Sequence, residues 1–162
     1  MFKESYILDS MQIEVWESLA DVYSVVENYD QSDFFYEKIL LKSPNNLTAC
    51  NNYAYYLSNR NKDLDKALIL AQRALDGNSE SSEYLDTYGW IKFKLGDYQV
   101  ALEFVEKSLQ YNDTHSEVYG HLADIYLMLG NIVEAKKALD KALVIDPDNI
   151  KLLEKRKLLE TK

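Results

Sequence analysis

Few residues of this chain could do chemistry, and their spacing suits neither a metal site nor a catalytic site. The two histidines, His115 and His121, stand six residues apart with no cysteine near them, which makes a poor pair of metal ligands. Cys50 is the single cysteine, so the chain has no internal disulfide and no cysteine-based metal site. We expect Cys50 to be a thiol packed in the core.

The alternating polar residues that begin at Asn59 resemble the start of a calcium-binding loop. Such a loop requires Gly at its sixth position and Glu at its twelfth, and here these are Leu64 and Leu70. We therefore interpret the run as a polar turn. No Gly-rich phosphate loop, nucleophile elbow or Ser-His-Asp arrangement occurs either. We predict no enzyme activity, no catalytic residue, no metal and no cofactor. The run consists of Asn59, Asn61, Asp63 and Asp65.

An internal repeat supplies the elements that would position a binding site. Two stretches of 34 residues align without a gap, and each has a Leu-Gly pair before its middle turn and an Ala five residues after that Gly. A third stretch keeps this period, and a fourth is one residue longer in the turn. A 34-residue period indicates an array of helix–turn–helix units. The four copies are residues 13–46, 47–81, 82–115 and 116–149.

The pattern within each copy is helical. Apolar residues recur at helical spacing, as in Leu122, Ile125, Tyr126 and Leu129. Small residues recur at one position of each first helix, where they allow a second helix to approach closely. These small residues are Ala20, Ala54, Gly89 and Ala123. We predict an all-α fold with helices of about 13 residues.

The copies resemble the tetratricopeptide repeat, whose pattern is a Trp, a Leu-Gly pair, a Tyr, an Ala, an aromatic residue and a closing Pro. The first copy departs from this pattern because Glu27 stands where the pattern has its turn Gly. The third copy departs from it because Asp113 stands where the pattern has its closing Pro. A looser resemblance is to the C-terminal repeats of larger bacterial proteins of this family. The resemblance implies a right-handed α-solenoid closed by a capping helix. Matching residues of the fourth copy are Tyr119, Leu122, Ala123, Tyr126, Gly130, Ala135, Leu139, Ala142 and Pro147.

The two ends of the chain differ. Residues 150–162 read as a capping helix, with Ile150, Leu153 and Leu159 on the last repeat and basic residues outside. Residues 1–12 align with the last third of a repeat, which suggests a remnant of a preceding repeat and a fragment of a longer protein. The compartment, cytoplasmic or periplasmic, then depends on the missing part.

The charge of the chain is concentrated where the resemblance places a ligand. The net charge of −9 argues against binding to nucleic acid. The sequence contains no apolar run of 18 residues, so we predict no membrane span in it. In tetratricopeptide repeats, five positions of each first helix line a concave groove. Here these 20 positions hold seven acids and one base. We favour an acidic binding groove, and the alternative is a solvated helix face.

Three aromatic residues also fall on the implied groove face: Tyr55, Trp90 and Phe93. Large aromatic side chains are typical binding anchors, although Trp90 could instead pack against the neighbouring repeat. The best-known site of the family is a basic clamp for a C-terminal carboxylate. We reject that function, because only one of the five clamp positions holds a suitable residue and three hold acids that would repel a carboxylate. The five positions are Glu17, Asp21, Asn52, Glu83 and Thr87.

We therefore predict a protein–protein interaction module whose groove binds a partner segment that carries Lys or Arg and an apolar residue. One alternative is a structural spacer or self-assembly element that associates weakly through its N-terminal end, where Trp16, Leu19 and Tyr23 would be poorly covered. Another is a non-catalytic scaffold within a larger protein. The predicted groove residues are Glu17, Asp21, Asn51, Tyr55, Asp86, Trp90, Phe93 and Asp124.

Overall fold

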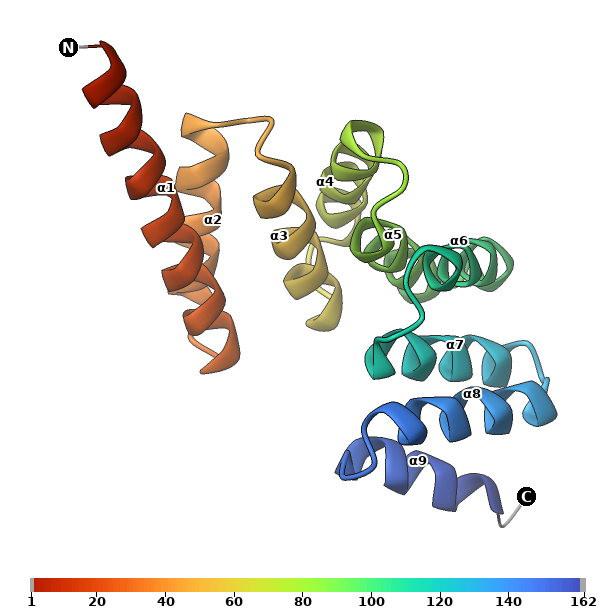
Figure 1. The fold of residues 1–162 in the computed structure, drawn as a ribbon. Coiled ribbons are helices and arrows are strands. Elements are labelled where there is room, and N and C mark those ends of the chain that lie inside the picture. Colours follow the sequence, from red (N-terminus) through yellow and green to blue (C-terminus); the bar gives the residue numbers. More distant parts are fainter. Residues whose placement is uncertain (1, 161–162) are drawn as a thin grey trace. The chain divides into compact units, whose positions relative to one another are not determined.

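The chain is all α-helix across residues 2–160, with short turns between the helices (Figure 1). The computed structural model describes the backbone of these residues and the side chains of residues 11–160. The predicted fold class, an all-α helical-repeat solenoid with a C-terminal helix, is confirmed. The helices are α1 (Phe2–Val25), α2 (Tyr29–Lys42), α3 (Leu47–Asn59), α4 (Leu64–Gly77), α5 (Ser82–Lys94), α6 (Tyr98–Tyr111), α7 (Ser116–Met128), α8 (Ile132–Ile145) and α9 (Ile150–Glu160).

The helices belong to two compact units, Met1–Gly77 with α1 to α4 and Asn78–Lys162 with α5 to α9. In the first unit α1 pairs with α2 and α3 pairs with α4. In the second unit α5 pairs with α6, α7 pairs with α8, and α9 lies against α8. Each pair is a helix–turn–helix hairpin, which is the local structure that the 34-residue period predicts.

The turn inside every hairpin has the same backbone geometry. Its second residue lies in the left-handed region, and the next amide donates a hydrogen bond to a carbonyl five residues earlier, which closes the first helix. Two of these left-handed residues are glycines, whose missing side chain makes the conformation easy to adopt. The residues and their φ angles are Glu27 (60°), Asn61 (50°), Gly96 (84°) and Gly130 (77°). The bonds run from Asn28 to Tyr23 (2.8 Å), Lys62 to Leu57 (3.0 Å), Asp97 to Lys92 (2.9 Å) and Asn131 to Tyr126 (2.8 Å).

Close approach between paired helices depends on small residues, as the repeat pattern predicts. A Cβ at Gly89 of α5 would lie 2.8 Å from Val105 Cγ2 and 3.2 Å from the carbonyl oxygen of Ala101, both on α6. At the corresponding position of the other first helices, Ala20, Ala54 and Ala123 are fully buried. The small side chain at this position therefore sets how closely each hairpin can close.

The N-terminal helix is longer than the repeat alignment suggests. The remnant interpretation places a turn near residue 12, whereas α1 continues from Phe2 to Val25 without a break. No Gly or Pro occurs in this stretch to end a helix. The side chains of residues 1–10, on which the remnant interpretation depends, lie outside the described residues.

The C-terminal helix packs through a different face from the one predicted. Leu152 and Leu159 are buried in the core of the second unit, whereas Ile150 and Leu153 are exposed, so the prediction that these two cover the last repeat is wrong. Leu152 N–H donates to Asn149 Oδ1 at 3.3 Å, which fixes the start of the helix. The sequence of α9 has two apolar stripes, and the stripe with Leu152 and Leu159 is the one that packs into the core.

Candidate partner-binding surface

In the second unit, Asp86 of α5 forms a buried pair with His121 of α7. Both residues are 7% exposed, and His121 Nδ1 lies 3.0 Å from each carboxylate oxygen of Asp86. Burial alone lowers the pKa of His121, but the Asp86 carboxylate, with Glu117 and Asp124 nearby, raises it above the ordinary value. The Asp86 side chain therefore joins α5 to α7, which is the first helix of the next hairpin.

Trp90 of α5 is 8% exposed and belongs to the same buried cluster. Its indole stacks on the His121 ring with centroids 4.0 Å apart, and on the Phe93 ring at 4.8 Å. Lys94 Nζ lies 4.7 Å from the indole centroid, within the range of a cation–π contact. Trp90 thus packs against the neighbouring repeat, as the alternative interpretation holds, while Phe93 is half-buried beside it.

Asp124, on the same side of α7, is neutralised by the C-terminal helix. Lys155 Nζ of α9 lies 2.6 Å from Asp124 Oδ2. This carboxylate is half-buried. A cationic partner would therefore compete with Lys155 for it.

In the first unit the two predicted acids of α1 also have partners. Asn46, which caps α3, donates from Nδ2 to Glu17 Oε1 at 2.6 Å. The hydroxyl of the buried Tyr36 on α2 donates to Asp21. Burial and this bond to Asp21 raise the pKa of Tyr36 well above its usual range. Both acids are half-buried, so they hold α2 and the α3 cap in place and still face solvent in part.

On α3, Asn51 and Tyr55 have different environments. Asn51 is buried and donates from Nδ2 to Asn52 Oδ1 at 3.3 Å, but its own Oδ1 has no hydrogen-bond partner among the described residues. An unpaired buried acceptor costs about 1–3 kcal/mol, so such atoms are rare. Tyr55 is half-buried, with its ring edge-to-face against Tyr56 at 5.8 Å.

Among the seven acids at the implied groove positions, the three exposed to solvent are Glu14, Glu83 and Glu117, each the second residue of its 34-residue copy. Glu83 accepts from the Ser81 hydroxyl at 2.9 Å. A backbone amide and this hydroxyl hold the pKa of Glu83 below its usual value, so it is ionised at neutral pH. Further along α5 and α7, a half-buried or exposed apolar end follows these acids, formed by Phe93, Leu127 and Met128.

His121 is the residue that sequence reasoning missed. The sequence suggests it only as a metal ligand with His115, yet it lies on Asp86, 35 residues earlier. Asp86 is the fifth residue of α5 and His121 is the sixth residue of α7. The two residues are therefore separated by one repeat period of 34 residues and one further residue, and this spacing places them opposite each other on neighbouring first helices. An opposite-charge pair at this spacing in a repeat protein is the signal that could have found it.

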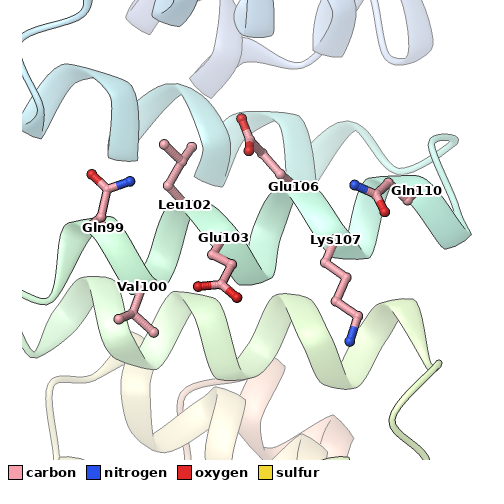
Figure 2. A pocket seen from close by; sticks show the side chains of 7 residues that line it. All are labelled: Gln99, Val100, Leu102, Glu103, Glu106, Lys107 and Gln110. Carbon is pink, nitrogen blue, oxygen red and sulfur yellow. The ribbon is translucent and has the colours of Figure 1, made fainter.

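Some surface hollows of the second unit lie along its second helices. One is lined by α6 alone, and Figure 2 shows its carboxylates, Glu103 and Glu106, beside Lys107 and two glutamines. Others are lined by residues of α6, α7 and α8, including Tyr119 and Lys141. Burial, together with the bond that Tyr126 donates to Glu106 Oε1 at 2.7 Å, raises the pKa of Tyr126 to about 12. These hollows contain none of the eight predicted groove residues.

The described residues contain neither a cluster of metal ligands nor a membrane-spanning helix. No group of three or more His, Cys, Asp or Glu side chains is placed to hold a metal ion within the part of the chain described. Over the same residues, none of the helices has the length and apolar character to cross a membrane.

The hairpins, their repeated turns and their small-residue contacts define a helical-repeat protein, and comparison with known proteins identifies the kind. A model of the tetratricopeptide repeat matches residues 92–156. The structure of a thermophilic tetratricopeptide repeat protein from Thermus thermophilus superposes with a TM-score of 0.81 at 19% identity, covering 99% of this chain and 88% of that one. Residues 92–156 therefore match the tetratricopeptide repeat, and the chain has the fold of a tetratricopeptide repeat protein.

Two further relatives show the range of this likeness. The first repeat domain of Spaghetti (RPAP3), solved with the HSP90 peptide SRMEEVD, has a TM-score of 0.65 at 16% identity and covers 71% of this chain and 93% of that one. The BBSome complex member BBS4 of Bos taurus is 26% identical over 115 residues, which are 71% of this chain. The chain spans about a fifth of that relative, 22% of its length. At these identities the structures show the shared fold alone.

Proposed function

We propose that this chain is a protein-binding module whose first helices bind a partner segment carrying Lys or Arg and an apolar residue. The tetratricopeptide repeat match over residues 92–156 and the peptide bound to one structural neighbour support protein binding in general. The observation that carries the finer proposal is the placement of Glu83 and Glu117. They occupy the same position of α5 and α7, are exposed, and lie on the helix faces that also present Phe93 and Met128.

The eight predicted groove residues then divide by burial. Five are half-buried and remain open to a partner, and they supply charge and one aromatic edge in each unit. Three are buried, and we propose that they fix the shape of the binding surface by packing. The half-buried residues are Glu17, Asp21, Tyr55, Phe93 and Asp124, and the buried ones are Asn51, Asp86 and Trp90.

The partner differs in charge from the acidic HSP90 peptide bound by the neighbouring structure. In that peptide three of seven residues are acidic, as the printed sequence SRMEEVD shows. Here the helix faces present Glu83, Glu117 and Asp124, and like charges would repel such a ligand. A basic segment would instead be attracted, and its approach would be accelerated at low salt.

The test uses a synthetic 15-residue peptide with three Lys and three Leu or Phe residues, and a matched peptide with Glu in place of each Lys. Fluorescence anisotropy measures binding to the wild-type chain and to the double variant E83Q/E117Q. Two solvent-exposed ion pairs contribute about 0.5–1 kcal/mol each, so the variant should bind the basic peptide roughly 5- to 30-fold more weakly.

The matched control is E103Q/E106Q on α6, which removes the same charge from the other side of the hairpin. It should bind as the wild type does. Equal losses in the two double variants would mean that the net charge of −9 attracts the peptide without a defined surface. Tight binding of the acidic peptide would contradict the proposal outright.

A further inference from the structure

Two acids on the first helices of the second unit are each paired with a basic side chain from the next repeat. Asp86 of α5 pairs with His121 of α7, and Asp124 of α7 pairs with Lys155 of α9. Lys155 follows His121 by 34 residues, which is one repeat period. In both pairs, therefore, the basic side chain comes from the same position of the repeat.

The two pairs differ in how open they are to solvent. The side chains of His121 and Asp86 are 8% and 10% exposed, and the Trp90 indole stacks on the imidazole ring. The side chains of Lys155 and Asp124 are 39% and 21% exposed. A partner cannot reach the first pair without opening the core, whereas the Lys155 ammonium can turn from Asp124 into solvent while both helices stay in place. The second pair is therefore exchangeable.

The Asp124 carboxylate lies on the face of α7 that the proposed partner segment uses. Glu117 and Asp124 are seven residues apart, which is about two turns of helix, so their side chains lie on the same side. Met128 follows Asp124 by four residues and lies on that side as well. Asp124 thus stands between the exposed acid and the exposed apolar end of α7.

Lys155 is the charge that occupies this carboxylate. Its Nζ donates to Asp124 Oδ2 at 2.6 Å, in a short charge-assisted hydrogen bond. The imidazole of His121 is also near Asp124, but its Nδ1 lies 3.0 Å from each carboxylate oxygen of Asp86. Because lysine carries a compact, strongly hydrated ammonium on a flexible stem, it can exchange its place with another cation.

We propose that Lys155 holds the place of a basic side chain of the partner, and that binding replaces Lys155 on Asp124. This inference rests on the proposed binding of a basic segment by α5 and α7, and it assigns one Lys or Arg of that segment to Asp124. Lys155 is then an internal competitor. Its removal should tighten binding, because the partner no longer has to break an ion pair to reach the carboxylate.

The test compares the wild type with K155Q, using fluorescence anisotropy and the basic 15-residue peptide at about 0.1 M salt. A solvent-exposed ion pair changes an equilibrium by a factor of up to about 5, so K155Q should bind the peptide about 2- to 5-fold more tightly. The matched control is K157Q, which makes the same change of charge at an exposed residue on the other side of α9. It should change the affinity by less than about 1.5-fold, because salt screens distant charges.

The variant D124N separates competition for the carboxylate from plain repulsion of the peptide. If Lys155 competes for Asp124, the gain from K155Q should shrink in the D124N background to the gain from K157Q. If Lys155 only repels the peptide, the gain should be equal or larger in that background, because Asp124 no longer neutralises Lys155. An equal or larger gain therefore overturns the inference.

A direct readout follows Lys155 in the wild-type chain and needs no variant of α9. At saturation with the basic peptide, the NMR signal of the Lys155 Cε carbon should move towards that of the exposed Lys157. A Lys155 signal that stays unchanged at saturation would show that the ion pair persists and would overturn the inference.

The outcomes distinguish this inference from the proposed function. If the wild type binds the basic peptide and K155Q binds it equally well, the inference fails and the proposed binding surface stands. If neither chain binds the peptide, both fail. Circular dichroism verifies that K155Q, K157Q and D124N keep the helix content of the wild type, and Gln is as favourable as Lys within a helix.

Discussion

The buried pair of Asp86 and His121 predicts an unusual dependence of stability on pH. The perturbation is D86N, which keeps the shape of the side chain and removes its charge. The folded pKa of His121 is raised above its unfolded value, so the pair's contribution to stability is fully present below the unfolded pKa. It is lost as the pH rises through the folded pKa. D86N should therefore be most destabilising at low pH and least at high pH.

The burial of the pair sets the magnitude of this effect. With both residues 7% exposed, removing the carboxylate below the unfolded pKa leaves a buried imidazolium that is no longer paired. That change costs about 3–5 kcal/mol. Above the folded pKa, D86N only exchanges one hydrogen bond for another, and the difference should shrink to about 1 kcal/mol. Glu117 and Asp124 of α7 also act on the ring and contribute to the raised pKa.

Urea unfolding between pH 5.5 and 8.5 measures the effect. The background variant W16F leaves Trp90 as the only tryptophan, so the fluorescence reports on the second unit and on the stacked His121 ring. H115N is the control, because His115 is exposed and its removal should leave the pH profile unchanged. A free-energy difference between wild type and D86N that stays constant with pH, or grows as pH rises, would refute this reasoning.

Two further predictions concern the repeat geometry. E27G should stabilise the first unit by about 1 kcal/mol, because Glu27 holds a left-handed φ of 60° that glycine adopts without strain, and G96A should destabilise the second unit by a similar amount. Thermal unfolding of both variants measures these changes. A change of stability with the same sign in both variants would contradict the prediction. G89A should destabilise by about 1–2 kcal/mol through the contact at 2.8 Å with Val105, whereas G120A, which meets only the tip of Leu152 at 3.2 Å, should be neutral or slightly stabilising.

The fold could be predicted because the repeat period is set by local physics. Each hairpin needs a left-handed residue in its turn and a small residue where the helices touch, and both recur at visible intervals. The same turn forms at Glu27, where the sequence lacks the glycine, because the neighbouring helices fix the backbone there. The period therefore predicts the position of the turn even where one residue disagrees.

The faces of single helices were harder to predict. The sequence of α9 offers two apolar stripes, and packing in the core of the second unit buries Leu152 rather than Leu153. Likewise, the absence of a helix breaker near residue 12 lets α1 continue through the expected boundary. In both cases the periodicity leaves the rotation or length of the helix open, and tertiary contacts determine it.

The candidate surface shows the same division. Sequence position places Glu17, Asp21, Asp86 and Asp124 on first helices, but it does not reveal that each carboxylate already bonds to Asn46, Tyr36, His121 or Lys155. These bonds join residues about 15 to 35 positions apart, and they depend on the register between neighbouring helices. A surface that looks uniformly acidic in the sequence is therefore largely paired, and its most exposed charges are Glu14, Glu83 and Glu117.

The most direct test of the proposed binding surface is amide chemical-shift mapping of the second unit within the whole chain, titrated with the basic 15-residue peptide. The account predicts shifts along α5 and α7, centred on Glu83, Glu117 and the amides near Phe93 and Met128. Shifts confined to α6 and α8, around Glu103 and Lys141, would place the ligand in the hollows of the second helices and would contradict the proposal.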